Sequence, residues 1–322
     1  MKIIFSLFLS LSSVSLLTAQ GVPFFPEEYV VTASSLNLRD APDAKAKKVA
    51  SLPRGSVVQF VGVALNGEYI EVDSVYDRWL QVRYQGKTGY AFGAYLAPTI
   101  GLYYENDQIY SALPPLNWYG VYARDSFADE IRKIEIRAVE EYSEFWGGKI
   151  TVLKTNQKQT SKFILGTHKP FRTGYAGPLG VYTVNDFFAN GSLGPGATMG
   201  ISPGYPEGDT TTKATYVLSA VGCAEFVDDY VVVRNYRLYA LDYTTQPATR
   251  QDLSHWVSPE VPEISPTVSL QWYGDLDGDN KPDAVIDDSP FEVSGRSSLF
   301  LSSMARPGEF LKKICEHFWP MD

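Results

Sequence analysis

The stretch that decides the fold reads LNLRDAP over residues 36–42, and two related stretches follow it: LPRGSVV over residues 52–58 and WLQVRYQGKTGYAF over residues 79–92. Each combines a short apolar run with Gly or Pro. In the last stretch, every second residue from Leu80 to Tyr84 is apolar or aromatic. Such alternation between turn residues is typical of short antiparallel strands. The pattern predicts a small barrel over residues 28–98.

These motifs, in this order, resemble the bacterial SH3 domain. The likeness covers the leucine–arginine opening with its proline turn, the hydrophobic turn at residues 52–55, and the closing hairpin that starts at Trp79 and leads to residues 95–96. The resemblance implies binding of cell-wall peptidoglycan or an envelope peptide. It also makes Trp79, Tyr90 and Tyr95 the candidates for the ligand groove. An alternative is that Trp79 and Tyr90 fill the barrel.

One segment departs from a minimal member of this family. Residues 65–77 are longer and more acidic than the fold requires, with Glu68, Glu71, Asp73 and Asp77. Loops at this place flank the binding groove, so the family's ligand is not transferred by the resemblance alone.

The N-terminus predicts export. Lys2 precedes an uncharged apolar and serine-rich run over residues 3–17, and small residues lead up to Gln20. This is the layout of a secretory signal, which predicts removal of residues 1–19 and a periplasmic or secreted protein. The alternative, a membrane anchor, is less favoured because about 15 apolar residues are fewer than the ~20 that a spanning helix needs. We expect no transmembrane segment after cleavage.

Composition narrows the class of partner. The formal net charge is -9, and no basic stripe interrupts the acidic character, so we expect no nucleic-acid partner. Aromatic residues make up 14% of the chain, with 21 tyrosines, which favours β-structure.

Residues 100–322 predict a larger, mainly antiparallel β domain with few helices. Residues 129–141 fit either a helix or a strand, and the Gly-Gly pair that follows favours a hairpin with residues 149–153. A Gly- and Pro-rich surface loop is expected over residues 190–209. A helix is expected over residues 309–318, where apolar residues recur at helical spacing.

The most specific motif outside the first module reads DLDGDNKPD over residues 275–283. Carboxylates at alternate positions of a tight loop converge on one point, and calcium takes several oxygen ligands at ~2.3–2.6 Å. The expected ligands are four carboxylates and one backbone carbonyl, from Asp275, Asp277, Asp279, Asp283 and Lys281 respectively. The stretch resembles the calcium loop of FG-GAP repeats, and residues 275–287 predict a structural Ca²⁺ site that joins two strands. The alternative is a solvated Asp-Gly turn.

The two cysteines, Cys223 and Cys315, predict a disulfide in an oxidising compartment. The alternative is a pair of buried thiols that behave as small apolar residues.

No complete catalytic constellation is evident. Cys223 lacks the flanking residues of a cell-wall peptidase nucleophile, and the nearest histidine candidate, His255, lies in an unrelated context. The three histidines share no ligand-spaced motif of a zinc amidase. The sequence therefore favours an exported, non-catalytic binding protein. The alternative is a divergent cell-wall hydrolase, a peptidase or an amidase, that the SH3-like module directs to its substrate.

Overall fold

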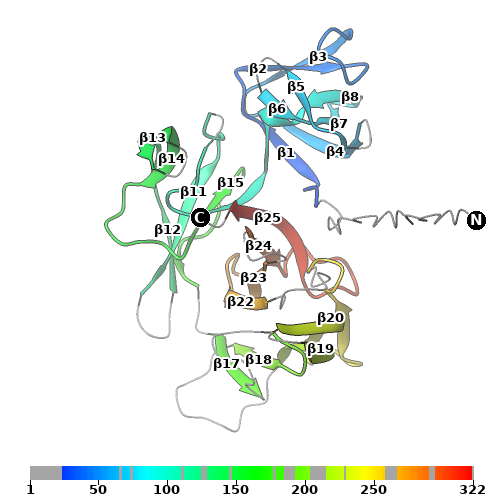
Figure 1. Ribbon diagram of the computed structural model, residues 1–322, viewed down its shortest axis with the longest axis vertical. Coiled ribbons are helices and arrows are strands. Elements are labelled where there is room, and N and C mark those ends of the chain that lie inside the picture. The colour runs from blue at the N-terminus through cyan, green and yellow to red at the C-terminus, as the bar shows by residue number, and fades with distance from the viewer. Residues whose placement is uncertain are drawn as a thin grey trace, which may run out of the picture.

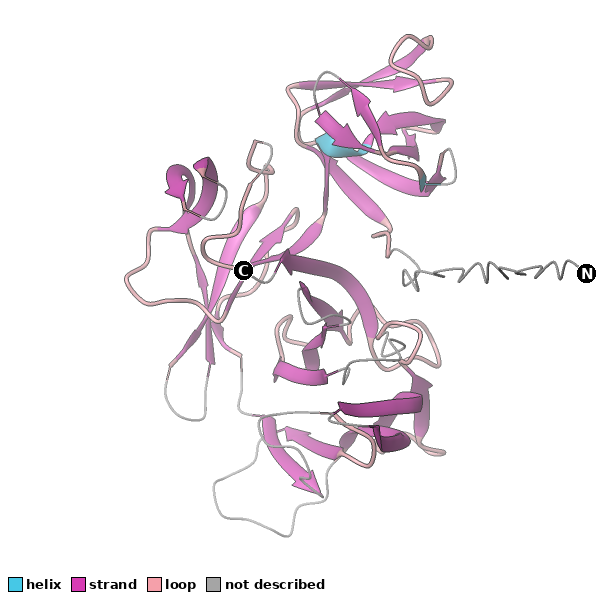
Figure 2. Ribbon diagram, in the orientation of Figure 1, coloured by secondary structure: helices cyan, strands magenta, loops and turns pink. Residues whose placement is uncertain are grey.

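The protein is almost entirely antiparallel β-structure (Figures 1 and 2), which confirms the predicted fold class. The computed structural model describes residues 24–64, 67–72, 75–109, 112–124, 129–144, 147–176, 179–184, 193–203, 215–227, 230–257, 267–289 and 294–320. The predicted signal peptide lies outside these residues. Within them, no helix has the length and apolar character needed to cross a membrane.

The N-terminal module is a seven-stranded sheet in the order β3-β2-β8-β7-β4-β1-β9. Its strands are β1 Glu28–Val31, β2 Ser35–Arg39, β3 Lys48–Pro53, β4 Val57–Val63, β7 Trp79–Tyr84, β8 Lys87–Phe92 and β9 Leu96–Pro98, with a 3-10 turn, η2, at Gly93–Tyr95. Alternate residues point inward, so Leu38, Leu52 and Val82 are fully buried in one apolar core. The predicted strand pattern is therefore found in the structure.

A short hairpin is inserted between β4 and β7, inside the segment that departs from the minimal family pattern. It consists of β5 Ile70–Val72 and β6 Val75–Asp77, paired so that Ile70 lies opposite Asp77. Its apolar residues pack over a second, smaller core of the module, formed around Ala64, Trp79 and Phe92.

The C-terminal part contains three larger sheets and one further hairpin (Figure 1). The first sheet holds β10 Ile100–Tyr103, β15 Phe163–Thr167, β11 Asn117–Ala123, β12 Asp129–Lys133 and β16 Gly174–Tyr175. The second holds β17 Leu179–Val184, β18 Thr198–Pro203, β19 Tyr216–Val227, β20 Tyr230–Asp242 and β21 Thr249–Asp252. The third holds β22 Thr267–Gly274, β23 Asp283–Ser289, β24 Ser294–Leu301 and β25 Lys312–Pro320. The hairpin pairs β13 Ile136–Ser143 with β14 Gly148–Thr155, as predicted.

The four-stranded sheet β22–β25 lies between the two five-stranded sheets. Along β23, Ala284 and Ile286 face the core shared with β17–β21, whereas Val285 faces the core shared with β10–β16. A strand buried on both faces needs a continuous apolar run rather than strict alternation. The run Ala284-Val285-Ile286 directly after the aspartate loop meets that requirement.

Two predictions of local structure are wrong. Residues 312–320 form strand β25, not a helix, and Cys315 lies opposite Leu299 of β24. The apolar spacing there is compatible with both periods, and pairing with β24 favours the strand. Within the expected loop over residues 190–209, residues 198–203 form strand β18, which pairs with β17 and β19. Residues 190–192 and 204–209 of that expected loop lie outside the described residues.

The predicted disulfide is also absent, because both cysteines are free thiols. Cys223 is exposed on β19, in one five-stranded sheet. Cys315 is buried on β25 in the core shared with the other five-stranded sheet. The two side chains therefore belong to different layers. Burial raises the pKa of the Cys315 thiol to about 12.

Candidate functional site

Trp79, the first aromatic candidate for the groove, is a core residue. Its side chain is only 3% exposed and packs 5.5 Å from Phe92, ring centre to ring centre. Ile70, Val72 and Val75 of the inserted hairpin pack against this pair. Trp79 is therefore an interior residue, as the alternative prediction held. It lies in the small core beneath the hairpin, however, and not in the main core of the barrel.

Tyr90 and Tyr95 are half-buried at the border of the same small core. The Tyr95 ring lies 6.1 Å from that of Phe92, centre to centre. The end of the hairpin is held against η2, because the Gly93 N–H donates to the carbonyl of Arg78, the residue that follows β6, at 2.9 Å. A Cβ at Gly93 would lie 3.0 Å from the Arg78 carbonyl oxygen, so only glycine allows this approach without movement of the backbone.

The outward face of the hairpin carries an aromatic pair that sequence reasoning missed. Tyr69 and Tyr76 are 48% and 68% exposed, and their rings stack with centres 5.5 Å apart. The Arg78 guanidinium lies 4.1 Å from the centre of the Tyr69 ring and donates to its hydroxyl. The sequence contains a signal for this pair. A tight turn between two short alternating runs brings tyrosines at positions 69 and 76 to the same face of a hairpin.

The aspartate loop connects β22 to β23 and brings together three of its carboxylates. Oxygens of Asp275, Asp277 and Asp283 lie within 4.8 Å of one another. Asp283 is fully buried, and its carboxylate accepts from the Leu276 N–H at 2.7 Å and the Ser302 N–H at 2.8 Å. The loop turns tightly at Gly278 and Asn280, which both have positive φ.

Asp279 is not among these three carboxylates, and the Lys281 carbonyl stays a predicted ligand. The carboxylate of Asp279 accepts the Lys281 N–H at 2.8 Å. The Ser302 hydroxyl lies 3.1 Å from carboxylate oxygens of both Asp279 and Asp283, so it links Asp279 to the cluster. Lys281 is exposed.

Burial and neighbouring carboxylates disfavour the charged forms of Asp277 and Asp283. Burial, and then the charge of Asp277, raises the pKa of Asp283 well above its ordinary value. The pKa of Asp277 is raised by burial and by its neighbours Asp279 and Asp275. Arg172 borders the loop, with Nε donating to the Leu276 carbonyl at 3.2 Å and Nη2 lying 3.8 Å from the Asp275 carboxylate. An all-oxygen, anionic donor set of this kind suits a hard divalent cation.

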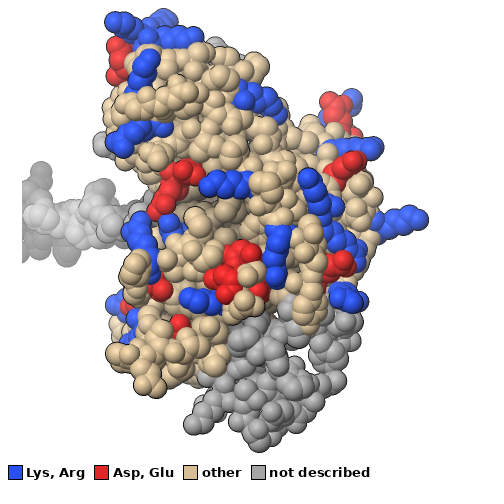
Figure 3. Space-filling model, turned by 180° about the vertical axis from the view of Figure 1, so that it is seen from behind, with Lys and Arg blue, Asp and Glu red and all other residues tan. Residues whose placement is uncertain are grey.

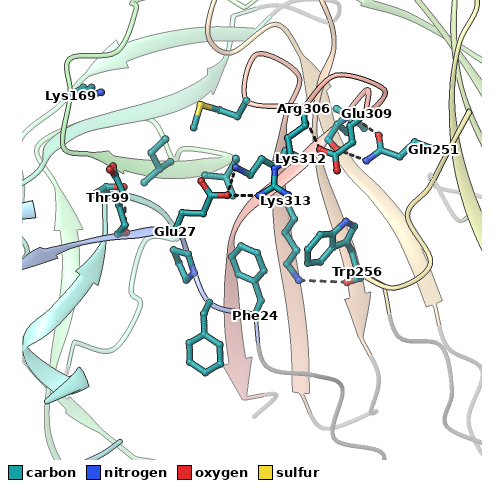
Figure 4. Close-up of a pocket in the computed structure, with 17 residues that line it drawn as sticks. Phe24, Glu27, Thr99, Lys169, Gln251, Trp256, Arg306, Glu309, Lys312 and Lys313 are labelled. Atoms are coloured by element: carbon teal, nitrogen blue, oxygen red, sulfur yellow. Dashed lines mark hydrogen bonds and ion pairs between the residues drawn. The ribbon is translucent and has the colours of Figure 1, made fainter. Parts of the chain in front are cut away.

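A cleft of about 420 Å³ lies where the residues before β1 meet the C-terminal sheets (Figure 4). Glu27 points into it and pairs with Arg306 at 3.0 Å and Lys312 at 2.8 Å. Its hydrogen bond from Lys312 is the main cause that lowers the pKa of Glu27. Phe24 packs 5.8 Å from Trp256, centre to centre. These contacts attach the segment before the module to the C-terminal part of the protein.

On the face that Figure 3 shows, the charged side chains are not divided into areas of one sign. On the face turned away from the viewer in Figure 1, acidic groups lie beside Lys and Arg side chains (Figure 3).

Comparison with known proteins bears on the first module. Residues 34–97 match the family described as the bacterial SH3 domain. No curated protein and no solved structure matches the chain. The match confirms that the N-terminal part carries a bacterial SH3-like module.

Proposed function

We propose that the protein is an exported, non-catalytic binding protein of the cell envelope, periplasmic or secreted, whose SH3-like module binds peptidoglycan or an envelope peptide. The family match over residues 34–97 is the observation that carries this proposal. The rigid aromatic surface on the inserted hairpin supports it.

The hairpin can present a binding surface because one of its faces is anchored on the module and the other is exposed. Ile70, Val72 and Val75 are anchored on the small core, so the opposite face is held in a defined position. That face presents the stacked Tyr69–Tyr76 pair, with Arg78 against one ring. Tyr and Arg are enriched among residues that dominate binding energy, because they offer large rigid contact areas with a polar end. We propose that Tyr69 and Tyr76 contact the ligand, with Tyr90 and Tyr95 at the border of the site.

Retention of the mature protein on insoluble peptidoglycan tests this proposal. Tyr76→Ala and Tyr69→Ala are each expected to weaken retention about tenfold, equivalent to ~1.4 kcal/mol. Tyr142→Ala is the matched control, because Tyr142 is 70% exposed on β13, outside the module. Equal retention of the Tyr76→Ala and Tyr142→Ala variants would contradict the assignment. Cleared zones on a wall-containing gel would instead favour the alternative of a divergent hydrolase.

We further propose that the aspartate loop binds Ca²⁺ in a structural role. The three converging carboxylates and the raised pKa values of Asp277 and Asp283 support a site that a divalent cation stabilises. Asp283 is the first residue of β23 and contacts Ser302, just after β24, so a cation there would hold β22, β23 and the end of β24 together. Asp279 would complete the site through a small movement of its side chain away from Ser302.

A further inference from the structure

A second cleft, of about 370 Å³, lies on the C-terminal sheets and shares no lining residue with the aspartate loop. It is lined by residues from segments that are far apart in the sequence, namely Tyr104, Asp107, Gln271, Asp287, Ser297 and His317. None of them belongs to the SH3-like module or is a proposed calcium ligand. A volume of this size suits a small organic ligand or one residue of a larger one.

The floor of the cleft is a row of residues across three neighbouring strands. Asp287 of β23 lies directly opposite Ser297 of β24, and Ser297 lies directly opposite His317 of β25. Residues that are directly opposite in antiparallel strands project from the same face of the sheet. Gln271 of β22 extends the row, with Nε2 donating to the Asp287 carboxylate at 3.3 Å.

The wall of the cleft is the turn that follows β10. The Tyr104 N–H donates to one carboxylate oxygen of Asp107 at 2.7 Å, and the other oxygen lies 3.3 Å from Nε2 of His317. The Tyr104 hydroxyl donates to the Ser297 hydroxyl oxygen at 3.0 Å, and its ring lies 5.2 Å from the His317 ring. These bonds fix the wall against the floor, so the cleft is formed before any ligand arrives.

The chemistry of the lining selects for positive charge. Two carboxylates face the cleft, and the one basic side chain among its described lining residues is His317, which lies beside Asp107. The negative field reaches Tyr104, whose pKa is raised to about 12 by burial first and also by Asp287 and Asp107. An anionic ligand would be repelled here, whereas an ammonium group gains two counter-charges and the face of an aromatic ring.

We propose that this cleft binds an organic ammonium group, with Asp287 and Asp107 as counter-charges and the Tyr104 ring as an apolar wall. The proposal does not depend on what the SH3-like module binds. Free amino groups of peptides belong to this class, and their aliphatic stems would lie against the Tyr104 ring.

Titration calorimetry on the complete mature protein tests the proposal with Nα-acetyl-lysine amide as the probe. Its Nε-acetylated form is the uncharged comparison, because acetylation removes the ammonium charge and keeps the stem. We expect only the charged probe to bind. Asp287→Asn and Asp107→Asn should each weaken binding at least about tenfold, whereas Asp252→Asn should bind as the wild type does. Asp252 is the matched control, since it is an exposed carboxylate on β21, outside the cleft.

Gln271→Lys provides a second test that retains both carboxylates. Gln271 is exposed on β22 beside Asp287, so a lysine there is tolerated and places its own ammonium in the cleft. This variant should melt as the wild type does and no longer bind the probe. Equal binding of the two probes, equal weakening by Asp252→Asn, or no binding by the wild-type protein would each overturn the proposal.

Discussion

Two connections between neighbouring antiparallel strands are stabilised by different kinds of interaction. The inserted hairpin at residues 70–77 and the aspartate loop at residues 275–283 each connect strands that belong to one sheet. The hairpin buries Trp79 and Phe92 beneath apolar side chains. The loop buries Asp283 among other carboxylates. Apolar burial stabilises the folded hairpin independently of the ions in solution. Crowded carboxylates instead make the stability of the loop depend on a counter-charge.

Removing the apolar contact should have the largest effect. Trp79→Ala leaves a cavity beneath the hairpin, and such losses cost about 3–5 kcal/mol. Amides of β7 and β8 should therefore exchange with solvent much faster, while those of β22–β25 are unaffected. Tyr76→Ala removes an aromatic ring from the other face of the hairpin and should cost less than about 0.5 kcal/mol. Equal exchange rates in the two variants would show that Trp79 contributes no core packing.

Calcium should act on the second segment alone. A ligand that binds only the folded state stabilises it by about 2.7 kcal/mol at a hundredfold excess over Kd. The melting temperature of the C-terminal sheets should rise with millimolar calcium and fall in chelator, and magnesium should act weakly because it requires a tighter octahedral site. Asp277→Ala should abolish the response, and Asp252→Asn should preserve it. An identical melting curve in calcium and in chelator would contradict the calcium site and favour the alternative, a solvated Asp-Gly turn.

The sequence predicted those parts of the molecule in which neighbouring residues determine the structure. The strands of the first module follow from alternation and turn residues between residues 36 and 92. Asp275 and Asp277 converge as their alternate spacing in a tight loop predicts, and Asp283 joins them from six positions further along the chain. The spacing did not show that Ser302, from the turn after β24, would engage Asp279.

Features that depend on distant pairing could not be predicted in this way. Strand β25 has apolar spacing that also fits a helix, and only its partner β24 decides between them. The cleft at His317 exists because Tyr104 is brought to Ser297 across 193 positions of sequence. Burial of Trp79 depends on a hairpin whose residues, read alone, indicated an acidic surface loop.

A pair of glycine substitutions gives the smallest expected difference and compares the two parts of the molecule directly. Gly86 lies in the β7–β8 turn with φ 77°, and Gly278 lies in the aspartate loop with φ 86°. An alanine at either position adopts a left-handed conformation that costs ~1–2 kcal/mol, so this contribution cancels between the two variants. A Cβ at Gly86 meets nothing within 4 Å, whereas at Gly278 it would lie 3.1 Å from Cδ of Arg172.

The residual difference between the two variants therefore reports the contact with Arg172. That side chain is flexible, so we expect Gly278→Ala to be more destabilising than Gly86→Ala by no more than about 1 kcal/mol in urea unfolding. Because Arg172 also donates to the Leu276 carbonyl, its displacement should loosen the loop. Calcium should then recover part of the loss in Gly278→Ala and none of it in Gly86→Ala. Equal costs with no recovery would mean that Arg172 and the aspartate loop are not coupled.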